Sequence, residues 1–248
     1  MTRDTLAQTF LSTGADYERY RPGFPRQAAE MILPEQVASV LDLGAGTGKF
    51  TGLLIDRAEA VIAVDPSSAM LDQLRGRYPD VEAMVGTAES IPVPAESQDA
   101  VTVAQAFHWF DEAAACREIA RVLTDGGVLS LIWNGPDPTC PWDLAAHEVA
   151  HPGTTANVGR AETVFRPQDL PGFETVRGVR IPWKERISRA DYLLRWQTVS
   201  TFLAAEPAER LSKTARIEAI LDADPETSGR EMLELRQLTE VHLYRKDE

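Results

Sequence analysis

The segment LDLGAGTGKF, which runs from Leu41 to Phe50, constrains the fold of this 248-residue chain more than any other. A short apolar run leads into a turn that holds three glycines, Gly44, Gly46 and Gly48. Glycines are needed where a backbone turns sharply or approaches a ligand closely. The segment therefore predicts a strand, a loop that binds a nucleotide-like ligand, and the start of a helix.

Apolar runs rich in β-branched residues alternate with helical patterns through the first half of the chain. This alternation is typical of βαβ units and indicates an α/β fold with a parallel sheet. Asp111 is expected to cap the helix between the fourth and fifth strands, because apolar residues recur at helical spacing from there to Leu123. The predicted strands span residues 40–44, 60–65, 81–86, 99–105 and 127–134.

After Trp133 the alternation stops, and a proline-rich connection leads into a segment of mixed character that ends near Arg166. We interpret residues 135–205 as inserted and lid elements over a substrate site. We expect one domain over residues 1–248, with an N-terminal cap segment at 1–36. The C-terminal part predicts a strand, two helices and a last strand, over residues 174–188, 189–206, 207–223 and 239–246.

The charge of the chain limits its partners. The formal net charge is -13, from 38 acidic against 25 basic residues, and with no basic block a nucleic-acid partner is not expected. The N-terminus lacks the apolar core of a signal peptide, and no run approaches the roughly 18 apolar residues of a membrane span. We expect a cytoplasmic protein that does not bind membranes and is a monomer or homodimer. Cys116 and Cys140 lack the spacing of a zinc site, so we expect reduced thiols and no metal.

The spacing of the loop glycines argues against two common nucleotide loops. A dinucleotide fingerprint is GxGxxG, whereas this loop is GxGxG with Lys49 where the third glycine belongs. A Walker A loop fails because Leu43 and Phe50 occupy the positions of its first glycine and its hydroxyl residue. Two alternative functions stay open: an NAD(P)-dependent oxidoreductase, and a module that binds S-adenosylmethionine without catalysis.

Asp65 ends the second predicted strand, about 20 residues beyond the loop, where a carboxylate accepts hydrogen bonds from ribose hydroxyls. The alternative is an acidic residue at a helix N-terminus, because Pro66 and Ser67 begin the helix that follows. One residue can fill both roles.

Five motifs stand in order between Val40 and Trp133: LDLGAGTGKFT, AVDPSSAML, VGTAESIPVPAESQDAV, QAFHWF and RVLTDGGVL. With them the chain resembles the class I S-adenosylmethionine-dependent methyltransferases, in the small-molecule group similar to ubiquinone and menaquinone biosynthesis methyltransferases. The segment ADYERYRPGFP is similar to the N-terminal segment of trans-aconitate-type methyltransferases. The resemblance implies S-adenosylmethionine as cofactor and S-adenosylhomocysteine as product. It also implies a Rossmann-like doubly wound, seven-stranded, mostly parallel sheet with helices on both faces and an antiparallel last strand.

The resemblance also implies which residues hold the cofactor. The loop glycines pack against its methionine part, Asp42 reaches its amino group, and Asp65 holds the ribose. Met70 lies against the adenine or, at helical spacing with Leu71 and Leu74, in the core. The predicted cofactor residues are Asp42, Gly44, Ala45, Gly46, Gly48, Asp65, Pro66, Met70, Ala88, Glu89 and Gln105.

One motif departs from the family pattern. The family's third strand is followed by GDAE, in which the aspartate reads the adenine amino group, but here Thr87 replaces that aspartate. Adenine recognition then falls to the Ala88 backbone or to the Glu89 side chain.

Methyl transfer is an in-line displacement, so positioning and exclusion of water matter most, and a base is needed only by an acceptor that must lose a proton. Gln105, His108 and Trp109 follow the fourth strand, at the sheet edge where open α/β sheets bind ligands. Gln105 and His108 are the catalytic candidates. His108, whose ordinary pKa lies near neutrality, is either a general base, a hydrogen-bond donor or a structural histidine beside Trp109.

The acceptor site is predicted from residues far apart in the chain. Tyr20 and Arg21 offer directed donors that can clamp a carboxylate, or they lie at a solvated helix end. Trp133 is a candidate for the wall of the pocket, as are Trp142 and Trp196, which can equally be core residues. No NPPY-like segment follows the fourth strand, where AQAFHW stands, so a macromolecular acceptor is disfavoured. We expect O-methylation of a small-molecule carboxylate or hydroxyl, with Tyr20, Arg21, His108, Trp109 and Trp133 in contact with the acceptor.

Overall fold

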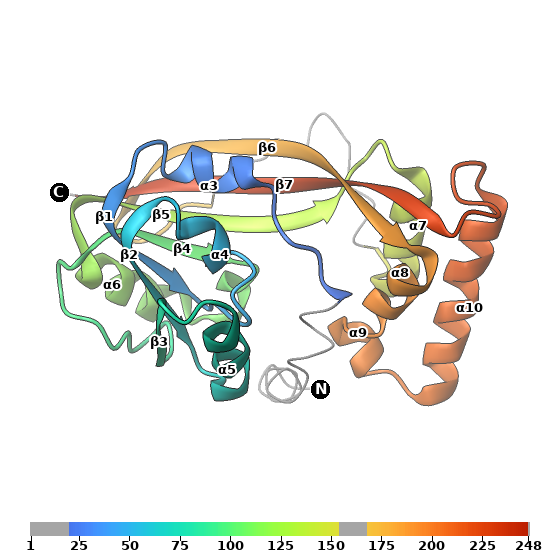
Figure 1. Cartoon of the computed structure of the whole chain (residues 1–248), viewed down its shortest axis with the longest axis horizontal. Helices are drawn as coiled ribbons and strands as arrows, with labels where there is room; N and C mark the ends of the chain where they lie inside the picture. The colour runs from blue at the N-terminus through green and yellow to red at the C-terminus, as the bar shows by residue number, and fades with distance from the viewer. Residues whose placement is uncertain (1–19, 154–167, 248) are drawn as a thin grey trace. The chain divides into compact units, whose positions relative to one another are not determined.

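The computed structural model of the chain describes residues 20–153 and 168–247 (Figure 1). These residues form two compact units. Residues 23–134, 168–181 and 239–247 make up the first, which we call the sheet unit. Residues 20–22, 135–153 and 182–238 make up the second, which we call the helical unit. Of the predicted cap segment, residues 1–19 lie outside the described part of the chain.

A seven-stranded sheet dominates the sheet unit, and its strand order is β3-β2-β1-β4-β5-β7-β6. The first five strands pair in parallel, and the last strands are antiparallel, which confirms the predicted fold class. Three of the strands, β5 to β7, also contribute residues to the helical unit. The strands are β1 (Val37–Leu43), β2 (Ala58–Asp65), β3 (Glu82–Val85), β4 (Gln98–Ala104), β5 (Leu123–Pro136), β6 (Phe173–Ser188) and β7 (Met232–Lys246).

The strand order sets the place of the ligand edge. From β1 the chain moves outward to β2 and β3, and it then returns to the other side of β1 with β4. Asp42, near the carboxyl end of β1, pairs with Ala63 of β2 on one side and with Thr102 of β4 on the other. Open α/β sheets bind their ligands at such a reversal, outside the carboxyl ends of the strands.

Helices cover both faces of the sheet because successive strand residues point to opposite sides. Val40 packs with Ile32 and Leu54 in one apolar cluster, whereas the next residue, Leu41, packs with Ile119 in another. The helices of this unit are α3 (Arg26–Ile32), α4 (Thr51–Leu54), α5 (Ser68–Arg77), the 3-10 helix η1 (Phe107–Trp109) and α6 (Glu112–Val122).

Side-chain caps explain where two of these helices begin. The Asp111 carboxylate accepts a hydrogen bond from the Ala114 backbone N–H at 2.9 Å, which confirms the predicted cap of α6. At α5, the Ser67 hydroxyl accepts from the Met70 N–H at 3.3 Å. Both caps stand directly after the loops at the ligand edge, so they fix where those loops end.

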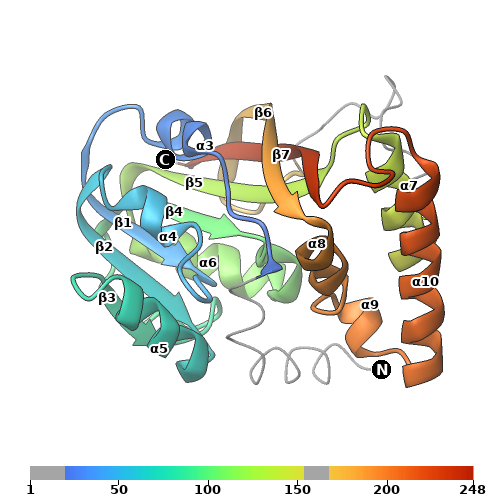
Figure 2. The same cartoon turned by 45° about the vertical axis from the view of Figure 1, so that its right-hand side comes forward.

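Within the described residues of the helical unit, four helices pack with residues of β6 and β7 around a separate apolar core. Figure 2 shows α7 and α10 side by side, and α8 also packs against α10. Trp142 and Trp196 are buried in this core with Tyr192 and Phe202, so the core alternative holds for both tryptophans. The helices are α7 (Pro141–Ala150), α8 (Arg189–Trp196), α9 (Ser200–Leu203) and α10 (Pro207–Ala223).

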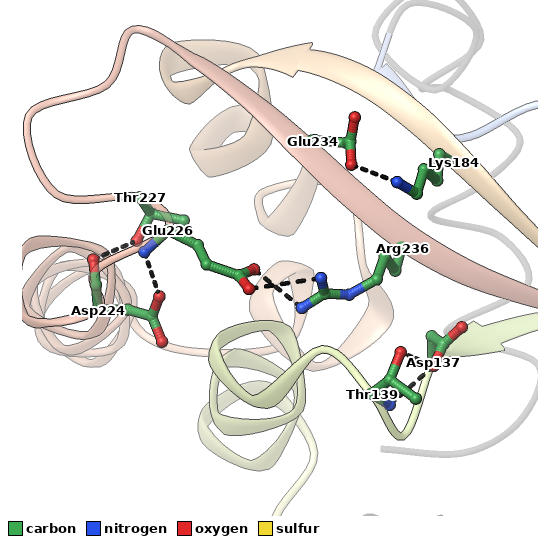
Figure 3. A network of polar contacts seen from close by, with 8 residues as sticks. All are labelled: Asp137, Thr139, Lys184, Asp224, Glu226, Thr227, Glu234 and Arg236. Carbon is green, nitrogen blue, oxygen red and sulfur yellow. Dashed lines mark hydrogen bonds and ion pairs between the residues drawn. The ribbon is translucent and has the colours of Figure 1, made fainter.

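The turn from α10 into β7 is held by polar contacts (Figure 3). The Asp224 carboxylate accepts from the Glu226 backbone N–H at 2.8 Å, and the Glu226 carboxylate pairs with Arg236 at 2.8 Å. Further along, Lys184 of β6 and Glu234 of β7 form an exposed ion pair at 2.6 Å. These contacts connect residues of the same unit that lie up to 50 positions apart in the chain.

Three differences from the predicted elements exceed a shift of a few residues at an end. The helix expected over residues 189–206 is broken into α8 and α9, because Val199 has an extended backbone and follows another β-branched residue, Thr198. The last strand begins at Met232 instead of residue 239, and the segment of mixed character contains α7. The interpretation of residues 135–205 as a lid stays a prediction. No helix within the described residues is long and apolar enough to cross a membrane.

Candidate functional site

The glycine loop connects β1 to α4 and has an unusual backbone. Gly44, Gly46 and Gly48 all have positive φ, at 73°, 56° and 86°. A β-carbon on Gly44 would lie 2.5 Å from the Ala106 β-carbon, and one on Gly48 would lie 2.9 Å from Leu74 Cγ. Positions 44 and 48 therefore require glycine both for conformation and for space. Position 46 requires glycine for its conformation alone, because a β-carbon there would lie 3.7 Å from Met70 Sδ, which is an ordinary contact distance.

Asp65 joins the loop to the helix that follows β2. Its carboxylate accepts from the Gly46 N–H at 2.9 Å through Oδ2 and from the Ser67 N–H at 2.8 Å through Oδ1. Burial raises the pKa of Asp65, while these two backbone donors act to lower it. The helix N-terminal role is therefore present. Each oxygen keeps a second lone pair, so hydrogen bonds from ribose hydroxyls are chemically compatible with it.

Asp42, near the carboxyl end of β1, is 1% exposed. The hydroxyl of Thr51 donates to Asp42 Oδ2 at 2.6 Å, and the hydroxyl of Thr102 donates to Oδ1 at 3.0 Å. Burial raises the pKa of Asp42 to about 6, against the opposite effect of the two hydroxyls. These contacts join the end of β1 to the first residue of α4, on the other side of the loop, and to β4. The predicted contact of Asp42 with the cofactor amino group stays a prediction.

Met70 and the leucines Leu71 and Leu74 of α5 have different neighbours. Leu71 and Leu74 pack into a core cluster with Ala63, whereas the Met70 sulfur lies beside Gly46 of the loop. Met70 is 7% exposed. A polarizable thioether next to the glycine loop is suited to lie against a flat ring.

Two predicted cofactor residues, Ala88 and Glu89, lie in the turn after β3 and have different surroundings. Ala88 is buried and its side chain packs in the same core cluster as Ile91 and Val101. The Glu89 carboxylate accepts from the Asp111 backbone N–H at 2.9 Å, which adds a second acceptor at the start of α6. Glu89 thus has a structural partner, and the backbone of Ala88 remains the simpler candidate for reading adenine.

Gln105, directly after β4, has a strained backbone. Its φ is 56°, which is uncommon for a residue other than glycine and costs about 1–3 kcal/mol. Its N–H donates to the Ile132 carbonyl at 2.8 Å, and its side-chain Nε2 donates to the Asn134 carbonyl at 3.1 Å. Such strain persists only where neighbouring structure holds it, and it is concentrated at functional sites.

Asn134 is a residue of this edge that the sequence analysis did not select. Its Nδ2 donates to the Gly23 carbonyl at 2.8 Å, and its Oδ1 accepts from the Thr239 hydroxyl at 2.6 Å. Together with its bond to Gln105, Asn134 joins the ends of β4 and β5 to β7 and to the segment before α3. Its position as the last residue of the predicted fifth strand was the only available signal.

His108 and Trp109 lie on η1, which is anchored by aromatic packing. Phe107 is buried and contacts Phe110 edge to face, with 5.7 Å between ring centroids. His108 is exposed and its ring lies 4.9 Å from that of Trp109. Its accessibility is compatible with the catalytic alternatives, which stay predictions.

Trp133 precedes Asn134 on β5. Its ring meets His242 edge to face, with 5.4 Å between centroids. Burial, with a smaller effect of Arg180, lowers the pKa of His242 to about 4. The Trp133 side chain therefore packs against His242, but it is only half-buried and part of it remains accessible to a ligand.

The structure brings together most of the predicted cofactor residues. Contacts connect Gly46 to Asp65 and Met70, and Gly44 to Ala106, the residue between Gln105 and Phe107. The remaining members are Ala45, which donates from its N–H to the Val64 carbonyl at 3.1 Å, and the exposed Pro66.

Tyr20 and Arg21 belong to the helical unit and are described with it. The Tyr20 carbonyl accepts from Arg195 Nε at 2.7 Å, and Arg21 donates to the Thr198 carbonyl at 3.1 Å. These bonds tie the segment to α8 and the connection that follows it. Within the described residues no group of three or more histidines, cysteines, aspartates or glutamates is arranged to hold a metal ion.

Comparisons with known proteins agree with this geometry. A family model described as a methyltransferase domain matches residues 41–131. An uncharacterized methyltransferase of Mycobacterium tuberculosis is 37% identical over 241 residues, which cover 96% of this chain and 96% of that protein. The malonyl-[acyl-carrier protein] O-methyltransferase of Methylococcus capsulatus is 42% identical over 100 residues, or 38% of this chain and 36% of that protein.

A solved structure extends the likeness to the whole fold. A protein of Anaeromyxobacter dehalogenans, described as a type II methyltransferase, matches with a TM-score of 0.67 and 25% identity, over 92% of this chain and 98% of that one. The match to the mycobacterial protein covers nearly the whole of both chains. The chain therefore belongs to the class I S-adenosylmethionine-dependent methyltransferases.

Proposed function

We propose that the protein transfers the methyl group of S-adenosylmethionine to an oxygen atom of a small-molecule acceptor, with a carboxylate or a hydroxyl as the favoured group. The observation that carries the proposal is the contact between the cofactor loop and the segment after β4. Ala106 lies against Gly44, so its neighbours Gln105 and the residues of η1 stand next to the loop. The relative that acts on malonyl-[acyl-carrier protein] supports oxygen as the methylated atom.

The cofactor residues divide by the part of the ligand that they suit. The backbone of the glycine loop approaches the methionine part, because its β-carbon-free surface allows close contact. Asp65 accepts from the ribose hydroxyls with the lone pairs that its two backbone donors leave open. Met70 and the backbone of Ala88 hold the adenine. Pro66 adjoins Asp65 and lies at the rim of this set.

When bound, S-adenosylmethionine supplies an electrophilic methyl group on a positively charged sulfur. The residues of the chain then have to hold an oxygen lone pair in line with that group and keep water away. Gln105 is suited to positioning because two hydrogen bonds fix its backbone and side chain. A carboxylate acceptor needs no base, whereas a hydroxyl acceptor loses its proton to His108.

The test is methyl transfer from isotopically labelled S-adenosylmethionine to a panel of small acids and alcohols, with the purified full chain. The expected products are a methyl ester or ether and one equivalent of S-adenosylhomocysteine. A labelled amine or thioether product, or transfer only to protein or nucleic acid, would refute the acceptor class.

Ligand identity separates the proposal from its alternatives. We expect S-adenosylhomocysteine to raise the unfolding temperature and NADH to leave it unchanged, because only a ligand that binds the folded state stabilises it. Stabilisation by NADH instead would favour the oxidoreductase. Stabilisation by S-adenosylhomocysteine without transfer to any acceptor would favour a binding module.

A further inference from the structure

The sheet unit contains a pocket that is separate from the candidate cofactor residues. It has a volume of about 220 Å³ and lies between two turns, one from α4 into β2 and one from α5 into β3. Ala58 and Val61, both in the first half of β2, contribute to its lining. Asp65, which binds the glycine loop, ends the same strand, so the pocket and the loop lie toward opposite ends of β2.

Backbone hydrogen bonds close both of these turns. The Arg57 N–H donates to the Leu54 carbonyl at 2.8 Å, and the Val81 N–H donates to the Tyr78 carbonyl at 3.1 Å. Beyond the second turn, β3 pairs in parallel with β2 from residue 82 onward. The fold therefore forms the walls of the pocket without a ligand, as is usual for sites that bind small molecules.

The ring of Tyr78 lines the pocket, and two glycines leave room for it. A β-carbon on Gly48 would lie 3.2 Å from Tyr78 Cε2, and a β-carbon on Gly52 would overlap the Tyr78 hydroxyl. Tyr78 also packs against the core cluster that contains Leu74 and Val81. Contacts with α4, the glycine loop and the core thus hold this aromatic wall in place.

Much of the remaining lining is apolar. Ala58 is 5% exposed and Val81 is 7% exposed, while Val61 is half-buried. Ile55, directly after α4, is 39% exposed, so a large apolar side chain remains in contact with water at this pocket. A ligand with an apolar body would remove this surface from water, which is favourable.

Two exposed carboxylates, those of Glu59 and Asp80, also line the pocket. Among the described residues, neither carboxylate takes part in a hydrogen bond or an ion pair. The described lining contains one cation, Arg77, whose guanidinium lies 5.9 Å from the centroid of the Tyr78 ring. Two negative charges against one positive charge favour a cationic ligand over an anionic one.

We infer that this pocket binds a small organic cation, in which an ammonium group is attached to an apolar body. Glu59 and Asp80 attract the ammonium group, while Tyr78 and the apolar lining cover the body. The volume lies below the roughly 300–1,000 Å³ of sites for drug-sized molecules, so the ligand is smaller than these. The inference does not depend on the proposed methyl transfer.

The test titrates the full chain with benzylamine, an ammonium on an aromatic body, and with its uncharged analogue benzyl alcohol. Methyl NMR resonances of Ile55 and Val81 report on the pocket, and those of Ile119, in another core cluster, serve as the internal control. We expect both ligands to shift only the pocket resonances. Benzylamine should bind about fivefold more tightly at low salt, because exposed charge pairs contribute modestly, and high salt should reduce this preference.

A pair of double variants assigns the preference to the two carboxylates. Glu59→Gln combined with Asp80→Asn should abolish the preference for benzylamine and leave the affinity for benzyl alcohol unchanged. Asp72→Asn combined with Asp125→Asn is the matched control, because it removes two exposed carboxylates of the same unit that do not line the pocket. This control should keep the full preference.

A third variant tests the apolar part of the site. Ile55→Ala should weaken the binding of both ligands about threefold, because it removes apolar contact area from an exposed wall of the pocket. S-adenosylhomocysteine should bind all variants as it binds the wild-type protein, which shows that each is folded. Equal affinities for the two ligands, equal losses in the two double variants, or displacement of S-adenosylhomocysteine by benzylamine would overturn the inference.

Discussion

Gln105 donates from its side-chain Nε2 to the backbone carbonyl of Asn134 at 3.1 Å, and this bond joins the carboxyl ends of β4 and β5. It helps to hold Gln105 at a φ of 56°, in a conformation that favours glycine. The strained residue stands next to Ala106, which packs on Gly44 of the glycine loop. A contact between strand ends thus positions Gln105, which we propose lies on the acceptor side of the site.

Substitution of Gln105 by glycine and by alanine separates strain from side-chain function. Both variants lose the bond to Asn134, but Gln105→Gly also loses the strain. We expect the glycine variant to be more stable than the alanine variant by about 1 kcal/mol, in urea denaturation. We expect kcat to fall in both. Equal stabilities would mean that the backbone relaxes without cost.

The loop glycines should differ in their tolerance of alanine. Gly44→Ala forces a positive φ and a 2.5 Å approach to Ala106, whereas Gly46→Ala forces only the positive φ. We expect Gly44→Ala to lose about 2–4 kcal/mol of stability and nearly all cofactor binding. Gly46→Ala should lose about 1–2 kcal/mol. Thermal unfolding and calorimetric titration with S-adenosylhomocysteine check the order, and the reverse order would contradict the loop geometry.

Asp65→Asn should weaken both the loop and the cofactor site. An amide has one acceptor oxygen, so the N–H of Gly46 or of Ser67 loses its partner, at a cost of about 1–3 kcal/mol. We expect S-adenosylhomocysteine to bind at least about tenfold more weakly. Asp72→Asn is the matched control, because Asp72 is exposed on the next helix and forms only a surface pair with Arg75. Similar affinities in the two variants would argue against a ribose contact.

Asp42 predicts a pH dependence of stability. Burial raises the pKa of this carboxyl to about 6, so the folded protein keeps a proton that the unfolded chain releases near pH 4. Stability from this group is therefore present below about pH 4 and is lost as pH rises to about 6. Relative to the Asp42→Asn variant, the wild-type protein should lose about 3 kcal/mol over that range. A constant difference between the two denaturation free energies would show that Asp42 does not titrate there.

His108→Ala tests the base role directly. If the acceptor is a hydroxyl, we expect kcat to fall about 100-fold with little change in stability, because the side chain is exposed. With a carboxylate acceptor the base has no task, and kcat should stay within a few-fold of the wild-type value. Full turnover with a hydroxyl acceptor would reject His108 as the base.

Much of the sheet unit was predictable because its signals are local. The glycine spacing between Gly44 and Gly48, the apolar strands and the Asp111 cap each depend on residues close in sequence, and strand β2 was expected to end at Asp65, as it does. The ordered motifs added the cofactor, which the family confirms. Local periodicity and turn chemistry suffice for such features.

Other features depended on contacts between distant segments. Glu89 accepts from the N–H of Asp111, and Asn134 bonds across to Gly23 and Thr239, in pairs that no local pattern reveals. The burial of Trp142 and Trp196 likewise follows from helix packing. The sequence by itself determined the order of the strands and the kind of cofactor. Only the tertiary structure decided which polar groups are occupied by structural partners, because hydrogen bonds and burial depend on residues that meet only in the folded chain.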